Sequence, residues 1–160
     1  IFNLERESFK FINSINFIKN YSVKKIYPNK LKVYLESAKA ISVVKHSNKL
    51  IVLGDNGKII DLENLPINVP QVTGTNDIKK VYQTLKMIDK SNFDIEDVKK
   101  IEFFVSDRID IELKNKKSVR FPINYTIDNL NFAFKLLDDD KYSKSKILDL
   151  RIPKKVITYD

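Results

Sequence analysis

The side chains that could do chemistry in this chain are few, and their spacing assembles neither a catalytic nor a metal site. His46 is the only histidine and there is no cysteine, so a zinc site of imidazole and thiolate ligands is excluded. We expect His46 to be a solvated loop residue. The run Asp138–Asp140 lacks the alternate spacing and the glycine of a calcium loop. The sequence therefore predicts no metal ion and no cofactor.

One short pattern matches a known catalytic motif in its letters only, and one glycine-containing turn does not match a phosphate-binding loop. Ser22 and Ser143 each precede a lysine by three positions, as in penicillin-binding enzymes. That chemistry also needs a helix start and two further motifs, which are absent here. The stretch 54–57, Gly-Asp-Asn-Gly, lacks the glycine spacing, the lysine and the following helix of a phosphate-binding loop. Since no nucleophile and base can be paired, we expect that the protein is not an enzyme.

The net charge of +8 raises the alternative of a nucleic-acid-binding protein. The charge is spread evenly, because residues 1–37 carry 7 basic and 3 acidic side chains and residues 38–160 carry 22 and 18. Of the 29 basic residues, 25 are lysines, as expected for solvated surfaces in a lysine-rich chain. Tyr21 and Tyr27, near Lys24 and Lys25, are the best candidates for stacking on bases. We favour solvated surfaces and expect no nucleic-acid partner.

The pattern of strands and helices along the sequence predicts an α+β fold. A β-hairpin is expected from strands near 20–27 and 30–36, because polar and apolar residues alternate on both sides of a Pro28-Asn29 turn. The alternation indicates that one face of this hairpin is buried. The residues of that pattern are Val23, Lys25 and Tyr27 on the first strand and Leu31, Val33 and Leu35 on the second.

The rest of the pattern predicts a mixed β-sheet domain with two or three helices. Helices are expected over 3–18, capped by Asn3, over 77–90, capped by Thr75 or Asn76, and over 127–138, with a helical turn or short helix within 94–100. Strands are expected over 38–44, 49–53, 58–60, 101–105, 108–113, 118–123, 146–151 and 155–159, and a loop over 61–76. A boundary near Ser37 divides the chain into residues 1–37 and 38–160. No stretch of about 18 apolar residues, the length of a membrane span, is present.

Several motifs occur in an order that resembles the extracytoplasmic part of the bacterial cell-division protein family FtsQ, called DivIB in Gram-positive bacteria. The resemblance departs from the family at Ser37-Ala38, where a proline is lost, at Phe121-Pro122, which replaces Leu-Gly, and at Ile152, which replaces a tyrosine. The matching segments are 1–4 (IFNL), 23–33 (VKKIYPNKLKV), Glu36, 55–59 (DNGKI), 69–74 (VPQVTG) and 148–151 (LDLR).

The resemblance implies a domain organisation and a location. Residues 1–37 would be the C-terminal part of a POTRA domain, a helix plus a β-hairpin, and 38–160 the family's β domain. The apolar start at Ile1 implies a chain that begins inside the POTRA domain, without its first strand and helix. An unpaired edge or an apolar surface is then expected on the remaining POTRA sheet. The full-length protein would cross the inner membrane once, with this segment in the periplasm.

The resemblance also implies a scaffold of the division machinery that binds FtsB and FtsL by strand addition at the last strands. The candidate binding residues are Arg151, Ile152, Val156 and Thr158. A second surface for other division proteins would include the hairpin residues Val23, Lys25, Tyr27, Pro28 and Leu31. Two alternatives stay open: Val156 is a core residue, and Arg151 pairs with Asp149 or Asp160. Another POTRA-containing envelope-assembly protein remains a competing identity.

Overall fold

The computed structural model describes residues 11, 12 and 14–160. Most of the helix predicted over 3–18, with its Asn3 cap, lies outside the described residues. Within them, Phe11, Ile12 and Ser14 are helical. The prediction is wrong at its other end, because strand β1 already begins at Ile18. Ile18 pairs with Ser37, so this residue belongs to the base of the hairpin.

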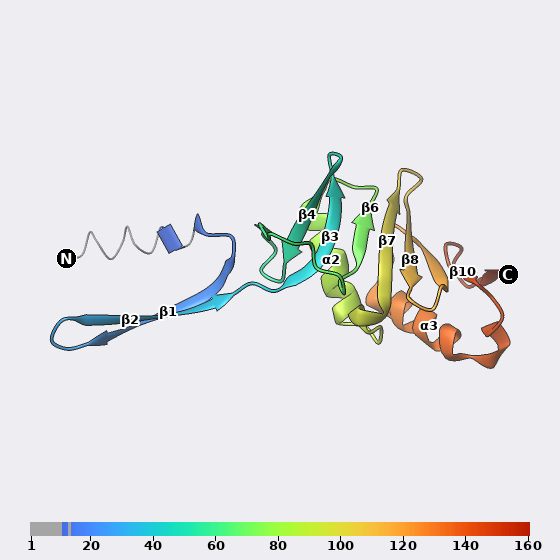
Figure 1. The fold of residues 1–160 in the computed structure, drawn as a ribbon. Helices are drawn as coiled ribbons and strands as arrows, with labels where there is room; N and C mark the ends of the chain where they lie inside the picture. The colour runs from blue at the N-terminus through green and yellow to red at the C-terminus, as the bar shows by residue number, and fades with distance from the viewer. Residues whose placement is uncertain (1–10, 13) are drawn as a thin grey trace.

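The predicted hairpin forms a separate two-stranded antiparallel sheet of β1 (Ile18–Ile26) and β2 (Lys30–Ser37). It projects away from the rest of the molecule (Figure 1). The expected half-buried face is wrong for the described residues, since every residue of β2 is exposed and Leu35 retains 58% of its surface. The alternation is real, with Val23 opposite Val33 and Lys25 opposite Leu31, but no described element covers the apolar side.

The remaining strands form one mixed sheet of nine, in the order β11-β10-β9-β8-β7-β6-β3-β4-β5. The pairs β3–β6, β6–β7 and β9–β10 are parallel, and the other neighbours are antiparallel. The strands are β3 (Ala40–His46), β4 (Lys49–Gly54), β5 (Ile59–Ile60), β6 (Gln71–Thr73), β7 (Val98–Phe104), β8 (Arg108–Leu113), β9 (Ser118–Pro122), β10 (Ile147–Asp149) and β11 (Ile157–Tyr159).

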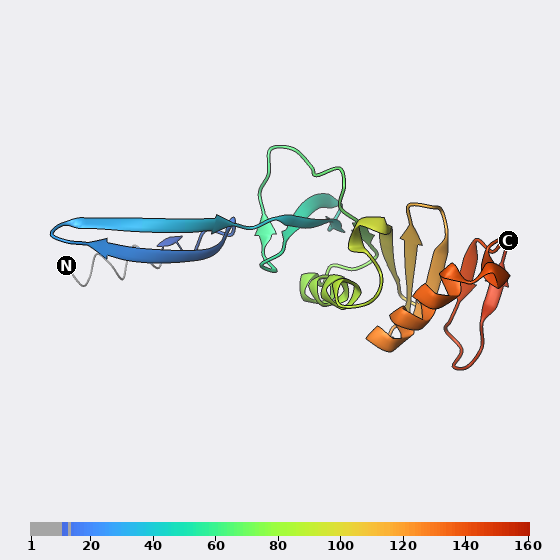
Figure 2. The same ribbon diagram turned by 90° about the horizontal axis from the view of Figure 1, so that it is seen from below.

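Two helices, α2 (Ile78–Asp89) and α3 (Ile127–Asp138), lie on the same side of this sheet (Figures 1 and 2). Asp77 caps α2 by accepting a hydrogen bond from the Lys80 amide, so the predicted caps Thr75 and Asn76 are wrong. Both of those side chains are engaged with other backbone amides. Short 3-10 helices follow α2 (Ile95–Asp97) and α3 (Asp140–Tyr142). No helix of the described part of the chain is long and apolar enough to cross a membrane.

The hydrophobic core lies between these helices and the sheet. Alternation along β8 is clean: Ile109, Ile111 and Leu113 are buried, whereas the residues between them are half-buried on the opposite face. The other large side chains of this layer that are almost fully buried include Leu53, Ile88, Ile101, Phe121, Leu130 and Leu148. The α+β fold class predicted from the pattern is therefore confirmed.

One central strand lies where a loop was predicted. β6 occupies Gln71–Thr73 within the predicted loop 61–76 and pairs with β3 on one side and β7 on the other. Only Val72 of this strand is buried, so three residues between Pro70 and Gly74 carry too little periodicity to indicate a strand. The other differences are in strand ends: β3 runs to His46, β7 begins at Val98, and β10 and β11 are shorter than expected.

Candidate partner-binding edge

Strand β11 forms one edge of the nine-stranded sheet. It pairs antiparallel with β10, with Leu148 opposite Thr158 and Asp149 opposite Ile157. Its three residues are all exposed. An edge strand leaves backbone N–H and C=O groups on its outer side available to a strand from another chain. The geometry at β11 is therefore chemically suited to strand addition.

An ion pair between a buried carboxylate and an exposed guanidinium marks the end of β10. The Arg151 guanidinium contacts the Asp149 carboxylate at 2.7 Å from Nη2 and 2.9 Å from Nε, and the Arg151 amide donates to the same group at 3.1 Å. Asp149 is only 2% exposed, whereas the Arg151 side chain remains partly open to solvent. Burial alone would raise the pKa of Asp149, but the hydrogen bonds from Arg151 outweigh it and hold that pKa below its ordinary value.

A second charged group lies beside this pair on the sheet face opposite the helices. Asp110 of β8 lies between Arg108 and Arg120, with Oδ1 2.9 Å from Arg108 Nε and Oδ2 3.6 Å from Arg120 Nε. These contacts lack hydrogen-bond geometry, and burial raises the pKa of Asp110 despite the two arginines. The Arg120 guanidinium also lies 5.3 Å from the centroid of the Tyr159 ring. Charge and an aromatic ring thus converge next to the free edge.

The four residues predicted to bind a partner fall in different environments. Arg151 and Ile152 are exposed neighbours just after β10, and Thr158 lies on the edge strand itself. Val156 is half-buried and packs against the core, as its alternative interpretation holds. Arg151 pairs with Asp149 rather than acting as an unengaged cation. The structure therefore places Arg151 and Ile152 on the exposed segment after β10 and Thr158 on the edge strand, whereas Val156 packs against the core.

Sequence reasoning missed Arg120, Ile157 and Tyr159. Arg120 lies opposite Asp110 of β8 and Asp149 of β10 in the strand registers. Alternation shows that each of these residues faces away from the core, but the sequence does not contain the register that joins them. One signal was visible: three of the four arginines in this lysine-rich chain occur within 108–151.

The second predicted surface lies at the far end of the hairpin. Tyr27 and Pro28 belong to the turn after β1, and the Tyr27 side chain is 88% exposed. Lys25 and Leu31 face each other across the strands, with Val23 two positions further along. These five residues share one arm of the molecule, well away from β11 (Figure 1). The two predicted surfaces are therefore separate.

The residues considered for catalysis or metal binding take ordinary structural places. Ser143 Oγ donates to the Asp140 carbonyl at 2.7 Å, and Asp139 caps the short helix that follows α3. The prediction of His46 as a solvated loop residue is wrong, because β3 extends to His46, which pairs with Lys49 and is half-buried. Its Nδ1 has no hydrogen-bond partner among the described atoms. The described residues contain no group of three or more metal-ligating side chains.

Replacing Arg151 with methionine is expected to destabilise the domain most near neutral pH, and this loss of stability should shrink as the pH falls. In the parent, the folded-state pKa of Asp149 is lowered. Its ionised carboxylate therefore stabilises the fold at pH values above the unfolded pKa of about 3.9, and this stability is lost as the pH falls through the folded-state pKa. Without Arg151, burial raises that pKa, so the ionised Asp149 carboxylate destabilises the fold and acid relieves this cost by protonating it. Urea midpoints measured from pH 3 to pH 8 should show a difference between parent and variant that is largest near neutral pH and shrinks towards pH 3. Lys155→Met, which removes an exposed charge nearby, should leave the pH dependence of the urea midpoint unchanged. Equal changes in both variants would contradict the role of the Asp149–Arg151 ion pair.

Comparisons with known proteins give a partial likeness to a solved structure. No family model matches the chain, and no curated protein matches it. Among solved structures, it is similar to the major extracytoplasmic domain of the bacterial cell-division protein DivIB from Geobacillus stearothermophilus, in its trans isomer. That alignment has 15% identity and a TM-score of 0.46, and it covers 62% of this chain and 87% of that one.

Proposed function

We propose that this chain is the extracytoplasmic part of a membrane-anchored bacterial cell-division scaffold of the FtsQ/DivIB type. The protein binds FtsB and FtsL and links early to late division components, without a catalytic role. The support is the order of the motifs along the chain, above all 23–33, 55–59 and 148–151. On this proposal the full-length protein crosses the inner membrane once and this segment is periplasmic.

The observation that carries the proposal is the free edge at β11. A partner strand added there gains backbone hydrogen bonds along the strand, and alternate side chains supply specificity. Ile157 and Tyr159 share one face of β11, and Thr158 lies on the other. Because the Arg120 guanidinium lies beside the Tyr159 ring on that face, a partner strand with an acidic side chain there is favoured.

The test is a proline at the edge. Thr158→Pro removes an amide and restricts the strand, and it is expected to weaken binding to the extracytoplasmic FtsB–FtsL complex by about tenfold or more, the equivalent of about 1.4 kcal/mol. Isothermal titration with the purified chain measures the affinity. Circular dichroism and thermal unfolding confirm that the variant is folded.

Asp61→Pro is the matched control, because it places the same change directly after β5 at the opposite edge of the sheet. It should leave the affinity unchanged. If Thr158→Pro binds like the parent, the edge assignment at β11 is wrong. A loss confined to Asp61→Pro would move the interface to β5.

A further inference from the structure

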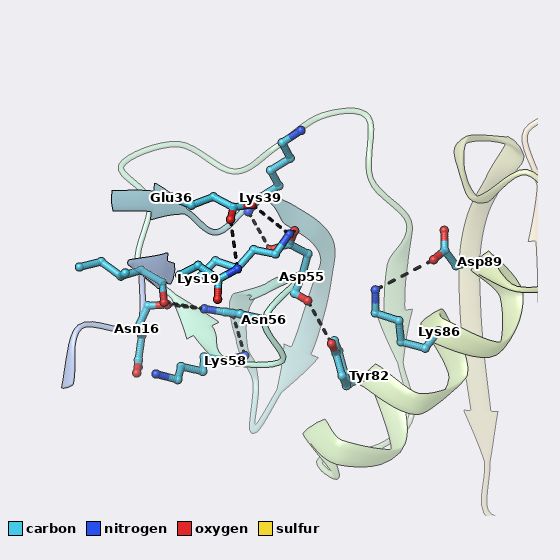
Figure 3. A network of polar contacts seen from close by, with 12 residues as sticks. Asn16, Lys19, Glu36, Lys39, Asp55, Asn56, Lys58, Tyr82, Lys86 and Asp89 are labelled. Carbon is cyan, nitrogen blue, oxygen red and sulfur yellow. Dashed lines mark hydrogen bonds and ion pairs between the residues drawn. The ribbon is translucent and has the colours of Figure 1, made fainter. Parts of the chain in front are cut away.

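A polar network joins the base of the hairpin to the sheet at the turn after β4 (Figure 3). The Lys19 ammonium of β1 lies 2.8 Å from Asp55 Oδ2 and 3.3 Å from Glu36 Oε1. Asn20 Nδ2 donates to the other oxygen of Glu36 at 3.1 Å. A single ammonium group therefore bridges both strands of the hairpin and a turn that lies 36 positions away in the sequence.

Backbone hydrogen bonds reinforce the same junction. Asp55 Oδ1 accepts from the Lys39 amide at 3.1 Å, and the Asp55 amide donates to the Lys39 carbonyl at 2.8 Å. Asn56 Nδ2 donates to the carbonyl oxygens of Asn16 at 2.9 Å and Ile18 at 3.3 Å. The turn thus contacts the chain on both sides of the hairpin, where β1 begins and where β2 has just ended.

The turn is itself held to the sheet domain by helix α2. The Tyr82 hydroxyl donates to the Asp55 carbonyl at 3.0 Å, and Tyr82 also packs against the core. Gly57 has a φ of +76°, and a Cβ there would lie 3.3 Å from the Tyr82 ring. Figure 3 shows Tyr82 reaching the turn from the helix side and Lys19 from the hairpin side. The turn therefore connects a rigid helix to the hairpin.

Electrostatics at the junction depend on Lys19. Hydrogen bonds from Asn20 and from Lys19 lower the pKa of Glu36. Burial would raise the pKa of Asp55, but hydrogen bonds from Lys19 and the Lys39 amide outweigh it, so that this pKa is lowered as well. The Asp55 side chain is 15% exposed. Removing the ammonium would leave two carboxylates at one site without the cation that lies between them.

We propose that Lys19, Glu36 and Asp55 form an ionic latch that sets the orientation of the hairpin relative to the nine-stranded sheet. The latch lies at the base of an arm whose second strand is exposed along its whole length. The orientation of the arm is therefore set by the contacts at this junction. This inference does not rest on the proposed division function.

The absence of cysteine from the sequence allows clean placement of two spin labels. Lys30→Cys labels the exposed start of β2 near the hairpin tip, and Lys79→Cys labels the exposed face of α2. Pulsed dipolar spectroscopy then reports the distance distribution between arm and sheet. In the parent we expect a single narrow distribution. With Lys19→Met, the ratio of molecules in the parent orientation to molecules in all other orientations should fall about twofold to fivefold. This is the size of effect expected for loss of an exposed ion pair.

Lys24→Met is the matched control, since it removes the same charge from the same strand away from the junction, opposite Lys32. It should leave the distribution unchanged. Asp55→Asn keeps an acceptor for the Lys39 amide and removes only the charge, so it should broaden the distribution like Lys19→Met. Combining the two substitutions should add little, because both break the same contact.

Thermal unfolding of each labelled variant checks that the sheet domain remains folded. A distribution in Lys19→Met and Asp55→Asn that coincides with the parent overturns the latch. So does equal broadening in Lys24→Met, because the effect would then be one of general charge. Neither result bears on FtsB–FtsL binding at β11.

Discussion

Gly74→Ala is expected to lower the free energy of unfolding by about 3 kcal/mol or more, among the largest effects of a single added methyl group. Gly74 follows β6 with a φ of +85°, and a Cβ built there would lie 1.8 Å from the carbonyl oxygen of Phe103. Relief requires moving the backbone of β6 or β7. Those two strands are paired in parallel, with Thr73 opposite Glu102, so the movement would disrupt the centre of the sheet.

Gly57→Ala separates this collision from ordinary backbone strain. Gly57 has a similar φ of +76°, but its nearest neighbour would be the Tyr82 ring at 3.3 Å rather than a backbone atom. Gly57→Ala should lower the free energy of unfolding by about 1–2 kcal/mol, the typical cost of a residue with a side chain in the left-handed backbone conformation. Urea unfolding of both variants measures the difference. Equal losses would show that the approach of Phe103 to Gly74 is not tight in solution.

Phe121→Ala is expected to cost about 3–5 kcal/mol of unfolding free energy, because it empties a fully buried aromatic position. Phe121 is inaccessible to solvent, and the centroid of its ring lies 5.4 Å from the centroid of the Tyr125 ring. It belongs to β9, which pairs with β8 on one side and β10 on the other. Since β11 is attached through β10, this loss should also weaken the candidate partner-binding edge.

Phe132→Ala provides the comparison for that change. The side chain lies on α3 and is 48% exposed, so its truncation should cost less than about 1 kcal/mol. Chemical unfolding followed by far-UV circular dichroism gives both values. A loss in Phe132→Ala as large as that in Phe121→Ala would mean that the exposed face of α3 is covered in solution.

Local patterns predicted most of the secondary structure. The α3 helix spans 127–138 as expected, because an apolar stripe follows the capping residue Thr126. Strand β8 matches its predicted bounds, since alternation over 108–113 is uninterrupted. The pattern failed where it was short, as in β6, whose three residues include a single buried side chain. It also failed to predict exposure in the hairpin, because periodicity shows that two faces differ but does not show what covers them.

The candidate site was predictable only in part. Arg151 was singled out together with Asp149, which is two positions away and is its ion-pair partner in the structure. The contribution of Arg120 depends on a register between β8, β9 and β10 that no local pattern contains. Val156 could be weighed as core or surface but not assigned, since burial depends on neighbours distant in sequence. Whether this edge binds a partner stays a prediction.

Composition and local patterns were sufficient to predict the α+β class, the hairpins, the two helices on the sheet and the scarcity of catalytic or metal-binding side chains. These follow from composition and from periodicities set by neighbouring residues. The folded structure was needed to show that β6 lies between β3 and β7, that β11 is an edge strand, and that Lys19 contacts Asp55. Those features are pairings between distant segments, and packing of the whole chain selects them rather than any local preference.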